Sequence, residues 1–268
     1  MPTLDKNERQ RLRAVQENLL QQCLSAGAEY IQMSTVGVIY HAQINEPIYN
    51  VVIPHHGVAW TRSQDIEDAF VYLNDHSRQP KFQFLQTLFP EAFERQLEIK
   101  GLVPEADSQI WLFEPFYGPS LPDEMLFGQP VTKSLVDHVK IVPVTTDAQR
   151  QQWHELTGQL DVPVPVKNWL WLAVNNQTPV GACRVVIQDK TAHIDPPTVA
   201  PKWSGFGIED ALLQVCVEKA LKETAQLIYA VDDASTDANY ARLGFIKFTR
   251  LLTYRANNHI PLTRPGNN

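Results

Sequence analysis

The stretch Val199-Ala-Pro-Lys-Trp-Ser-Gly-Phe-Gly-Ile-Glu-Asp-Ala-Leu-Leu213 decides the fold class. An extended, β-branched run ends in it, and an apolar run with helical spacing begins at Ile208. The order therefore predicts a strand, a tight turn and a helix. Gly205 and Gly207 let backbone N–H groups turn inward, and the helix N-terminus adds a positive dipole end, so the turn could hold a pyrophosphate. Many such turns bind nothing, and the pattern alone leaves that alternative open.

The residues around this stretch predict a mixed α/β sheet. Strands are expected at 139–144, 169–174, 180–187, 191–199, 227–231 and 245–254, and helices at 146–156, 208–221 and 237–243. Asn175–Pro179 indicates a hairpin between two of the strands. Pro196 and Pro197 cannot donate to a strand ladder, so the strand at 191–199 must be interrupted there. An antiparallel beginning followed by a βαβ unit is typical of a mixed sheet.

The first half predicts a second domain. Helices are expected at 8–24, from Ser63 onward and at 91–100, with strands at 36–41, 49–54, 82–88 and 109–114. Residues 115–135 are dense in proline and glycine, which marks a linker or a long crossing loop. We therefore expect two domains, at residues 1–128 and 136–268, and 268 residues are enough for two cores.

The charge distribution argues against nucleic acid as a partner. Residues 1–135 hold 17 acidic and 10 basic side chains, whereas residues 136–268 hold 13 of each. A nucleic-acid-binding protein usually has a basic face or stripe, and neither half has a basic run. The acidic first half is compatible with a solvated surface or with a cationic partner.

The sequence also indicates a cytoplasmic protein without a membrane segment. Met1–Arg13 is polar, unlike a signal peptide, and no stretch approaches the roughly 20 apolar residues of a membrane span. The three cysteines fit neither a zinc pattern nor a disulfide framework. His55 and His56 have no further ligands at metal-binding spacing, so we expect a loop there and no metal site.

A second motif narrows the function. Tyr240-Ala-Arg-Leu-Gly-Phe245 lies about 30 residues after the glycine turn. The two segments, in this order, resemble the GNAT acetyltransferases, whose core reads V-x-P-x-x-R-G-x-G-I-G-x-A-L-L and then Y-x-x-L-G-F. The first half, through Pro47–Ile53 and Leu97–Leu102, resembles the degenerate half of tandem GNAT proteins. This resemblance implies two tandem acyl-CoA N-acyltransferase-like domains.

The resemblance also implies roles for individual residues. The strand at Thr198, Val199 and Ala200 would pair with the pantetheine arm of acetyl-CoA. The pyrophosphate would be held by backbone N–H groups of the turn, namely those of Gly205, Phe206, Gly207 and Ile208. Tyr240 would donate a proton to the departing thiolate, a role typically worth 10²–10⁴ in rate. The alternative is that Tyr240 is only an amphipathic residue at a sheet edge.

Three positions depart from the family pattern. Ser204 replaces the usual Arg or Gln, which removes a charge-assisted contact, and Glu209 replaces a Gly or Ala and brings a carboxylate near the pyrophosphate. Asp233 stands where an asparagine that contacts the cofactor is common. Lys202 could compensate in part for these changes.

Candidates for a general base are His193 and Asp195, which lie two apart on one strand and should face the same side. Each could equally be a turn or surface residue beside the prolines. Our first hypothesis is an acetyl-CoA-dependent N-acetyltransferase acting on a small-molecule or protein amine. The second is a GNAT-fold protein that binds a ligand or partner without catalysis. A hydrolase is disfavoured because the chain has no G-x-S-x-G. The sequence identifies neither the acceptor nor the oligomeric state.

Overall fold

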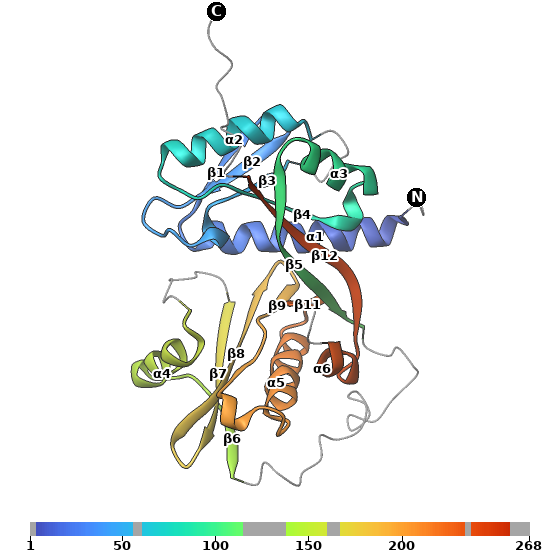
Figure 1. Cartoon of the computed structure of the whole chain (residues 1–268). Coiled ribbons are helices and arrows are strands. Elements are labelled where there is room, and N and C mark those ends of the chain that lie inside the picture. Colours follow the sequence, from blue (N-terminus) through green and yellow to red (C-terminus); the bar gives the residue numbers. More distant parts are fainter. Residues whose placement is uncertain (1–3, 56–60, 115–137, 160–166, 234–236, 258–268) are drawn as a thin grey trace, which may run out of the picture. The chain divides into compact units, whose positions relative to one another are not determined.

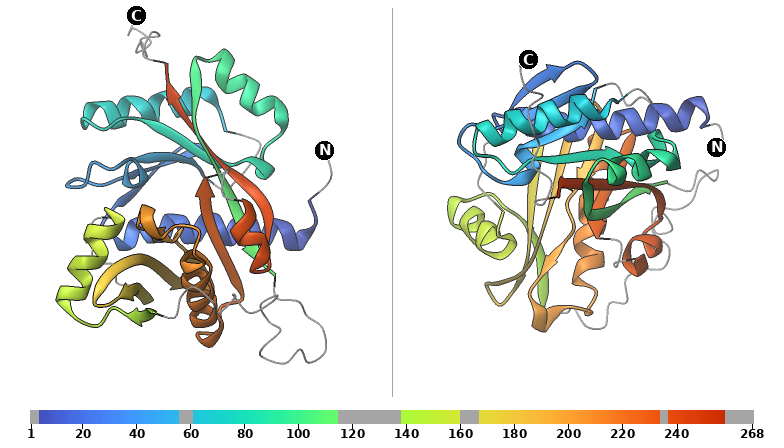
Figure 2. Two further views of the ribbon diagram at one scale, coloured as in Figure 1. Left: turned by 60° about the horizontal axis from the view of Figure 1, so that its bottom comes forward. Right: turned by 45° about the horizontal axis from the view of Figure 1, so that its top comes forward.

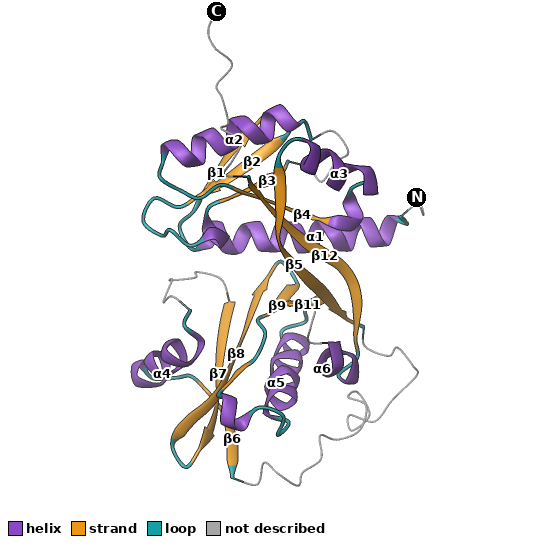
Figure 3. Cartoon of the chain, viewed as in Figure 1, coloured by secondary structure: helices purple, strands orange, loops and turns teal. Residues whose placement is uncertain are grey.

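The computed structural model describes residues 4–55, 61–114, 138–159, 167–233 and 237–257. The chain forms two compact units, each built from strands and helices (Figures 1 and 3). Unit 1 comprises Met1–Ser108 and Thr249–Asn268, and unit 2 comprises Gln109–Phe248. The predicted linker at 115–135 lies outside the described residues.

Unit 1 contains a sheet in the order β1-β2-β3-β4-β12. Neighbouring strands are antiparallel except for the parallel pair β3 and β4. The elements are α1 (Lys6–Ser25), β1 (Glu29–Met33), β2 (Val36–Tyr40), β3 (Val51–Pro54), α2 (Ser63–Asp75), β4 (Lys81–Leu85), α3 (Glu91–Ile99) and the second part of β12 (Phe245–Ala256). Short 3₁₀ turns lie at Pro47–Tyr49 and Gln86–Leu88.

Helices cover both faces of the unit 1 sheet. One face packs Val38 and Val52 against α2 and α3, through residues such as Phe70 and Phe93. The other face packs Ile39 against α1 near Cys23. The side-chain alternation of β2 produces this division, since successive residues of a strand point to opposite faces.

Unit 2 contains the elements predicted around the glycine turn. They are β6 (Val139–Pro143), α4 (Asp147–Thr157), β7 (Lys167–Asn175), β8 (Thr178–Gln188), β9 (Thr191–Ile194), β10 (Thr198–Val199), α5 (Ile208–Lys222), β11 (Leu227–Asp233) and α6 (Asp237–Arg242). The strand order is β11-β9-β8-β7-β6. Strands β6 to β9 pair antiparallel, and β11 is parallel to β9, so the predicted mixed sheet is confirmed.

The two faces of the unit 2 sheet carry different helices (Figure 2). Helices α5 and α6 pack on one face, where Leu212 and Cys216 meet Val185 and Ile194. Helix α4 packs on the other face, where Trp153 contacts Leu170 and its neighbours. The indole of Trp153 donates a hydrogen bond of 3.2 Å to the carbonyl oxygen of Cys183, which ties α4 to β8.

Two strands run through both units. Strand β5 (Leu102–Phe113) enters unit 2 at Gln109, and β12 leaves unit 2 at Thr249. In unit 1 the end of β12 pairs antiparallel with β4, from Leu251↔Leu85 to Arg255↔Lys81. The compact units therefore divide the chain differently from the expected domains at 1–128 and 136–268. The physical reason is strand pairing between segments that lie far apart in sequence.

Local signals missed or misjudged some elements. Strand β1 was not predicted, because Glu29 and Gln32 interrupt its apolar pattern and leave it only partly buried. Strand β5 begins at Leu102 rather than at 109 and includes Pro104. The interruption predicted for 191–199 is confirmed, since β9 ends at Ile194 and β10 begins at Thr198.

Candidate functional site

The candidate site begins where two parallel strands part. Strands β9 and β11 pair only over Thr191–Ile194 and Leu227–Ala230, and β11 then continues to Asp233. Strand β10 pairs with β8, at Thr198↔Ala182 and Val199↔Gly181. Because β9 and β10 both pair with β8, β10 continues the line of β9. Within the described part of the chain no strand pairs with the other edge of β10, so that edge is open to an extended ligand with amide groups.

The turn after β10 is shaped by its glycines. A 3₁₀ turn at Pro201–Trp203 leads into Gly205 and Gly207, which have φ angles of 80° and 82°. L-residues with side chains avoid this left-handed region, so the turn depends on glycine there. Helix α5 starts directly afterwards, with Gly207 as its N-cap.

This turn presents unused hydrogen-bond donors. Among the described residues, none accepts a hydrogen bond from the backbone N–H of Phe206, Gly207 or Ile208. Free N–H groups at a helix N-terminus, together with the helix dipole, favour an anion. The geometry of the turn therefore fits a pyrophosphate at these three donors.

Glu209 is the exception to that fit. Its Oε1 accepts a hydrogen bond of 3.0 Å from the Ser204 hydroxyl and one of 3.4 Å from the Gly205 N–H. The carboxylate thus takes up two donors at the entrance to the turn. An anionic ligand at Gly205 would have to displace it.

Tyr240, on α6, is buried in the core of unit 2, with 2% of its surface exposed. Its ring stacks on the indole of Trp111, with centroids 5.2 Å apart and planes at 13°. Phe245 meets the same ring edge-on, at 5.4 Å and 80°. The phenol hydroxyl makes no hydrogen bond of standard geometry to any described residue.

The environment of Tyr240 keeps its phenol protonated. Burial raises the pKa of Tyr240 strongly, and the carboxylate of Asp232, on β11, raises it further. Cys183 and Asp195 contribute in the same direction. Since Asp195 follows β9, the hydroxyl lies within electrostatic reach of both strands that part at the site. A phenol in this state can donate a hydrogen bond at any pH near neutrality.

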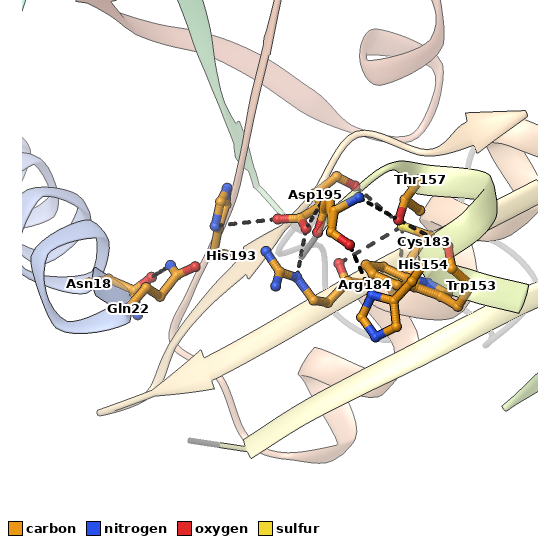
Figure 4. A network of polar contacts seen from close by, with 11 residues as sticks. Asn18, Gln22, Trp153, His154, Thr157, Cys183, Arg184, His193 and Asp195 are labelled. Carbon is orange, nitrogen blue, oxygen red and sulfur yellow. Dashed lines mark hydrogen bonds and ion pairs between the residues drawn. The ribbon is translucent and has the colours of Figure 1, made fainter. Parts of the chain in front are cut away.

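His193 and Asp195 lie on the same side, as their spacing predicts (Figure 4). His193 Nδ1 is 3.8 Å from Asp195 Oδ1, and its ring stacks on Tyr229 at 4.8 Å. Asp195 Oδ2 forms an ion pair of 2.6 Å with Arg184 Nε and accepts a hydrogen bond of 3.2 Å from Gln159. Both candidate bases are thus buried groups within a polar network.

The pKa values of His193 and Asp195 are lowered for different reasons. Burial lowers the pKa of His193 to about 4, with Asp195 opposing and Arg184 reinforcing the shift, so His193 is neutral at pH 7. Burial alone would raise the pKa of Asp195, but the Arg184 guanidinium, together with His193 and the hydrogen bond from Gln159, outweighs burial and holds that pKa below its ordinary value. Asp195 is therefore the weaker proton acceptor of the two near neutral pH.

His193 should make stability depend on pH. Because its pKa is lowered in the folded state, the unfolded chain takes up the proton first as pH falls through 6.5, and stability is lost until about pH 4. Between pH 7 and pH 5 we expect the free energy of unfolding of the native protein to fall by about 2 kcal/mol more than that of His193→Gln. Urea unfolding at both pH values measures this. The exposed His76→Gln is the control, and equal losses in the native protein and His193→Gln would contradict the assignment.

The structure brings most of the predicted residues to one end of unit 2. Residues 198–200 and the turn at 204–209 follow β9 directly, and Tyr240 reaches the same strands from α6. Asp233 ends β11, but its side chain lies outside the described part. Sequence reasoning missed Arg184, Gln159 and Trp111. No local signal identifies them, because their partners are more than ten residues away in the chain.

Two further findings concern metal-binding groups and helices that could cross a membrane. In the described ranges, no group of three or more His, Cys, Asp or Glu side chains is arranged to hold a metal ion. His55 accepts or donates a 2.7 Å hydrogen bond with the Tyr30 hydroxyl, and His56 lies outside these ranges. No described helix combines the length and apolar character that a membrane crossing requires.

Comparison with known proteins places the fold. Residues 141–245 match the model of the acetyltransferase (GNAT) family. A GCN5-related N-acetyltransferase from Kribbella flavida superposes with a TM-score of 0.71 at 12% identity, over 91% of this chain and 95% of that one. A tandem GNAT protein from the clavulanic acid biosynthesis pathway superposes with a TM-score of 0.55 at 14% identity, over 77% of this chain and 74% of that one.

A third structure, a GCN5-related N-acetyltransferase from Sphaerobacter thermophilus, gives a TM-score of 0.56 at 14% identity, over 82% of this chain and 76% of that one. The comparison with curated proteins gave no significant match. At these identities the structures establish a shared fold. The fold covers most of the chain, as tandem domains require.

Proposed function

We propose that the protein is an acetyl-CoA-dependent N-acetyltransferase acting on an amine, as the match of residues 141–245 to the acetyltransferase (GNAT) family model suggests. The observation that carries the proposal is the open edge of β10 followed by a turn with three unused N–H donors. An extended amide-containing arm and a pyrophosphate suit these two features in that order. The acceptor, a small molecule or a protein amine, remains part of the proposal.

Each residue has a definite task in this proposal. Bound acetyl-CoA supplies an acetyl thioester, whose carbonyl carbon forms a bond to the amine nitrogen while its bond to sulfur breaks. The backbone of Thr198–Ala200 pairs with the arm, and the N–H groups of 206–208 hold the phosphates. Tyr240 donates to the sulfur. The strongly raised pKa of Tyr240 favours a hydrogen bond that stabilises the thiolate, since full transfer to a thiolate would be uphill.

His193 is the better candidate for receiving the proton that the amine loses. It is neutral near pH 7, whereas Asp195 is engaged by Arg184 and Gln159. With a pKa of about 4, His193 is a weak base, so it needs a neighbouring group that stabilises its protonated form. As an imidazolium forms, the Asp195 carboxylate would stabilise it at 3.8 Å.

Calorimetric titration with acetyl-CoA and with coenzyme A tests the proposal first, at low ionic strength. We expect binding in the micromolar range, about −8 kcal/mol, and release of free thiol when a panel of small amines and amine-bearing peptides is added with acetyl-CoA. Absence of heat and of a thermal shift at millimolar ligand would contradict the proposal.

A non-catalytic GNAT-fold protein is the second candidate, and Glu209 is the observation that favours it. Its carboxylate already bonds to Ser204 and Gly205 at the entrance to the turn. If the native protein binds no coenzyme A but the double variant Ser204→Arg, Glu209→Gly does, the second candidate is favoured. No gain from the double variant would remove its basis.

Replacing Glu209 by Gln should tighten coenzyme A binding by about 10- to 100-fold, because a carboxylate within about 5 Å of a phosphate repels it by a few kcal/mol before screening. Titration calorimetry of the variant measures the change, which should shrink as salt is added. Glu218→Gln removes the same charge two to three turns further along α5 and should change the affinity little. Weaker binding by Glu209→Gln would show that the carboxylate assists the ligand.

A further inference from the structure

Trp111 lies outside the segment that matches the family model, which covers residues 141–245. It belongs to β5, in the part of that strand that lies in unit 2, between β11 and β12 in the strand order. Its indole is 2% exposed, and its Nε1 has no hydrogen-bond partner among the described residues. The first half of the chain thus inserts a large aromatic side chain into the core of the second unit.

The contacts around Tyr240 show how the Trp111 indole restrains its ring. The near-parallel stack on Trp111 restrains the tilt of the phenol ring, and the edge-on contact with Phe245 restrains its rotation within that stack. Phe245 is itself held by Phe113, two residues beyond Trp111 on the same strand, at 5.4 Å. Aromatic packing on two sides therefore restrains the ring.

The hydroxyl of Tyr240 has charged neighbours at both strands β9 and β11. Asp232 and Asp195 both act on it electrostatically, and they lie on the two sides of the gap where β11 parts from β9. Aromatic rings therefore border the phenol ring, and carboxylates that follow or belong to the two parting strands act on its hydroxyl.

We propose that Trp111 is a positioning residue, which stacks on Tyr240 and holds its hydroxyl beside strands β9 and β11 where they part. The proposal rests on the proposed role of Tyr240 as donor to the leaving sulfur. It assigns part of the site to a strand from the first half of the chain. The second unit would then need β5 for the orientation of its donor as well as for its core.

Tyrosine labelled with ¹³C at Cζ makes the phenol visible by NMR. The chain has eight tyrosines, and the signal missing from Tyr240→Phe identifies the one of interest. In the native protein and in Trp111→Phe, which keeps a stacking ring, we expect this signal not to titrate up to about pH 11. In Trp111→Leu, which keeps apolar volume but no ring, we expect titration near the ordinary value of about 10.

A second buried tryptophan supplies the control. Trp153 is 1% exposed and packs α4 on the opposite face of the sheet. Trp153→Leu should lower stability to a similar degree and leave the Tyr240 signal unchanged. An unchanged Tyr240 signal in Trp111→Leu, or an equal shift in Trp153→Leu, would overturn the proposal.

Adding coenzyme A separates this proposal from the function on which it rests. The Tyr240 signal should shift on addition of coenzyme A in the native protein and in Trp111→Phe, and should shift less in Trp111→Leu. If coenzyme A bound to none of them, the proposed function would fail. The titration without ligand would still decide whether Trp111 orients Tyr240.

Discussion

A chain divided within residues 115–137 should give two segments that fold together but not separately. Each compact unit contains residues from both sides of that division. Trp111 and Phe113, from the first segment, are 2% and 6% exposed in the core of unit 2. Leu252 and Tyr254, from the second segment, are equally buried in unit 1.

The expected loss exceeds the stability of a typical domain. Truncating one buried aromatic side chain costs about 3–5 kcal/mol, and a whole domain is stable by about 5–15 kcal/mol. Segment 136–268 lacks Trp111 and Phe113, and it also lacks strand β5, which carries them. Segment 1–128 lacks the strand that pairs with β4 from Leu251 to Arg255.

Circular dichroism and thermal unfolding of each segment, alone and after joint expression, measure this. We expect no cooperative transition for segment 136–268 and a native-like one for the joint preparation. The longer segment 109–268 restores Gln109–Phe113 and should recover part of the cooperativity. Independent cooperative unfolding of 136–268 would instead support the domain boundaries expected from the sequence.

Replacing Tyr240 by Phe should lower the turnover of acetyl transfer by about 10²–10³, the usual contribution of a hydrogen-bond donor that stabilises developing negative charge. The variant loses only the hydroxyl, so the stack on Trp111 and the contact with Phe245 remain. Affinity for coenzyme A should stay within about twofold, because the phosphates and the arm are held elsewhere. Stability should change little, since the ring packing is kept and only the hydroxyl is removed.

Steady-state kinetics with an acceptor found in the amine panel, combined with calorimetry, separates these effects. Tyr254→Phe is the matched control, because Tyr254 is a buried tyrosine of unit 1 whose hydroxyl bonds to Glu94. It should leave turnover unaltered. In the native protein the strongly raised pKa of Tyr240 predicts no loss of turnover from its ionisation below about pH 10. Full activity in Tyr240→Phe would show that another group assists the sulfur.

The part of the site that could be predicted is contiguous in sequence. Gly205 and Gly207 were predicted to shape the turn, and both adopt the positive φ angles that favour glycine. Pro196 and Pro197 were predicted to interrupt a strand, and they lie between β9 and β10. These features depend on backbone constraints of single residues, so they are readable without knowing what packs around them.

The roles of ionisable residues were beyond local reasoning. His193 and Asp195 were equal candidates in the sequence, and the structure distinguishes them through Arg184 and Gln159. Those partners reach Asp195 from β8 and from the end of α4, 11 and 36 residues away in the chain. Burial, which lowers the pKa of His193, depends likewise on distant segments.

By itself the sequence determined most of the helices and strands, the mixed sheet of the second half and the glycine turn, because periodicity and backbone restrictions are local properties. Only the tertiary structure decided which strands complete which unit, since a strand's partner depends on pairing between segments more than a hundred residues apart. It also decided that Trp111 stacks on Tyr240 and that the Glu209 carboxylate bonds to the turn. Such contacts follow from packing, which no spacing in one stretch of chain specifies.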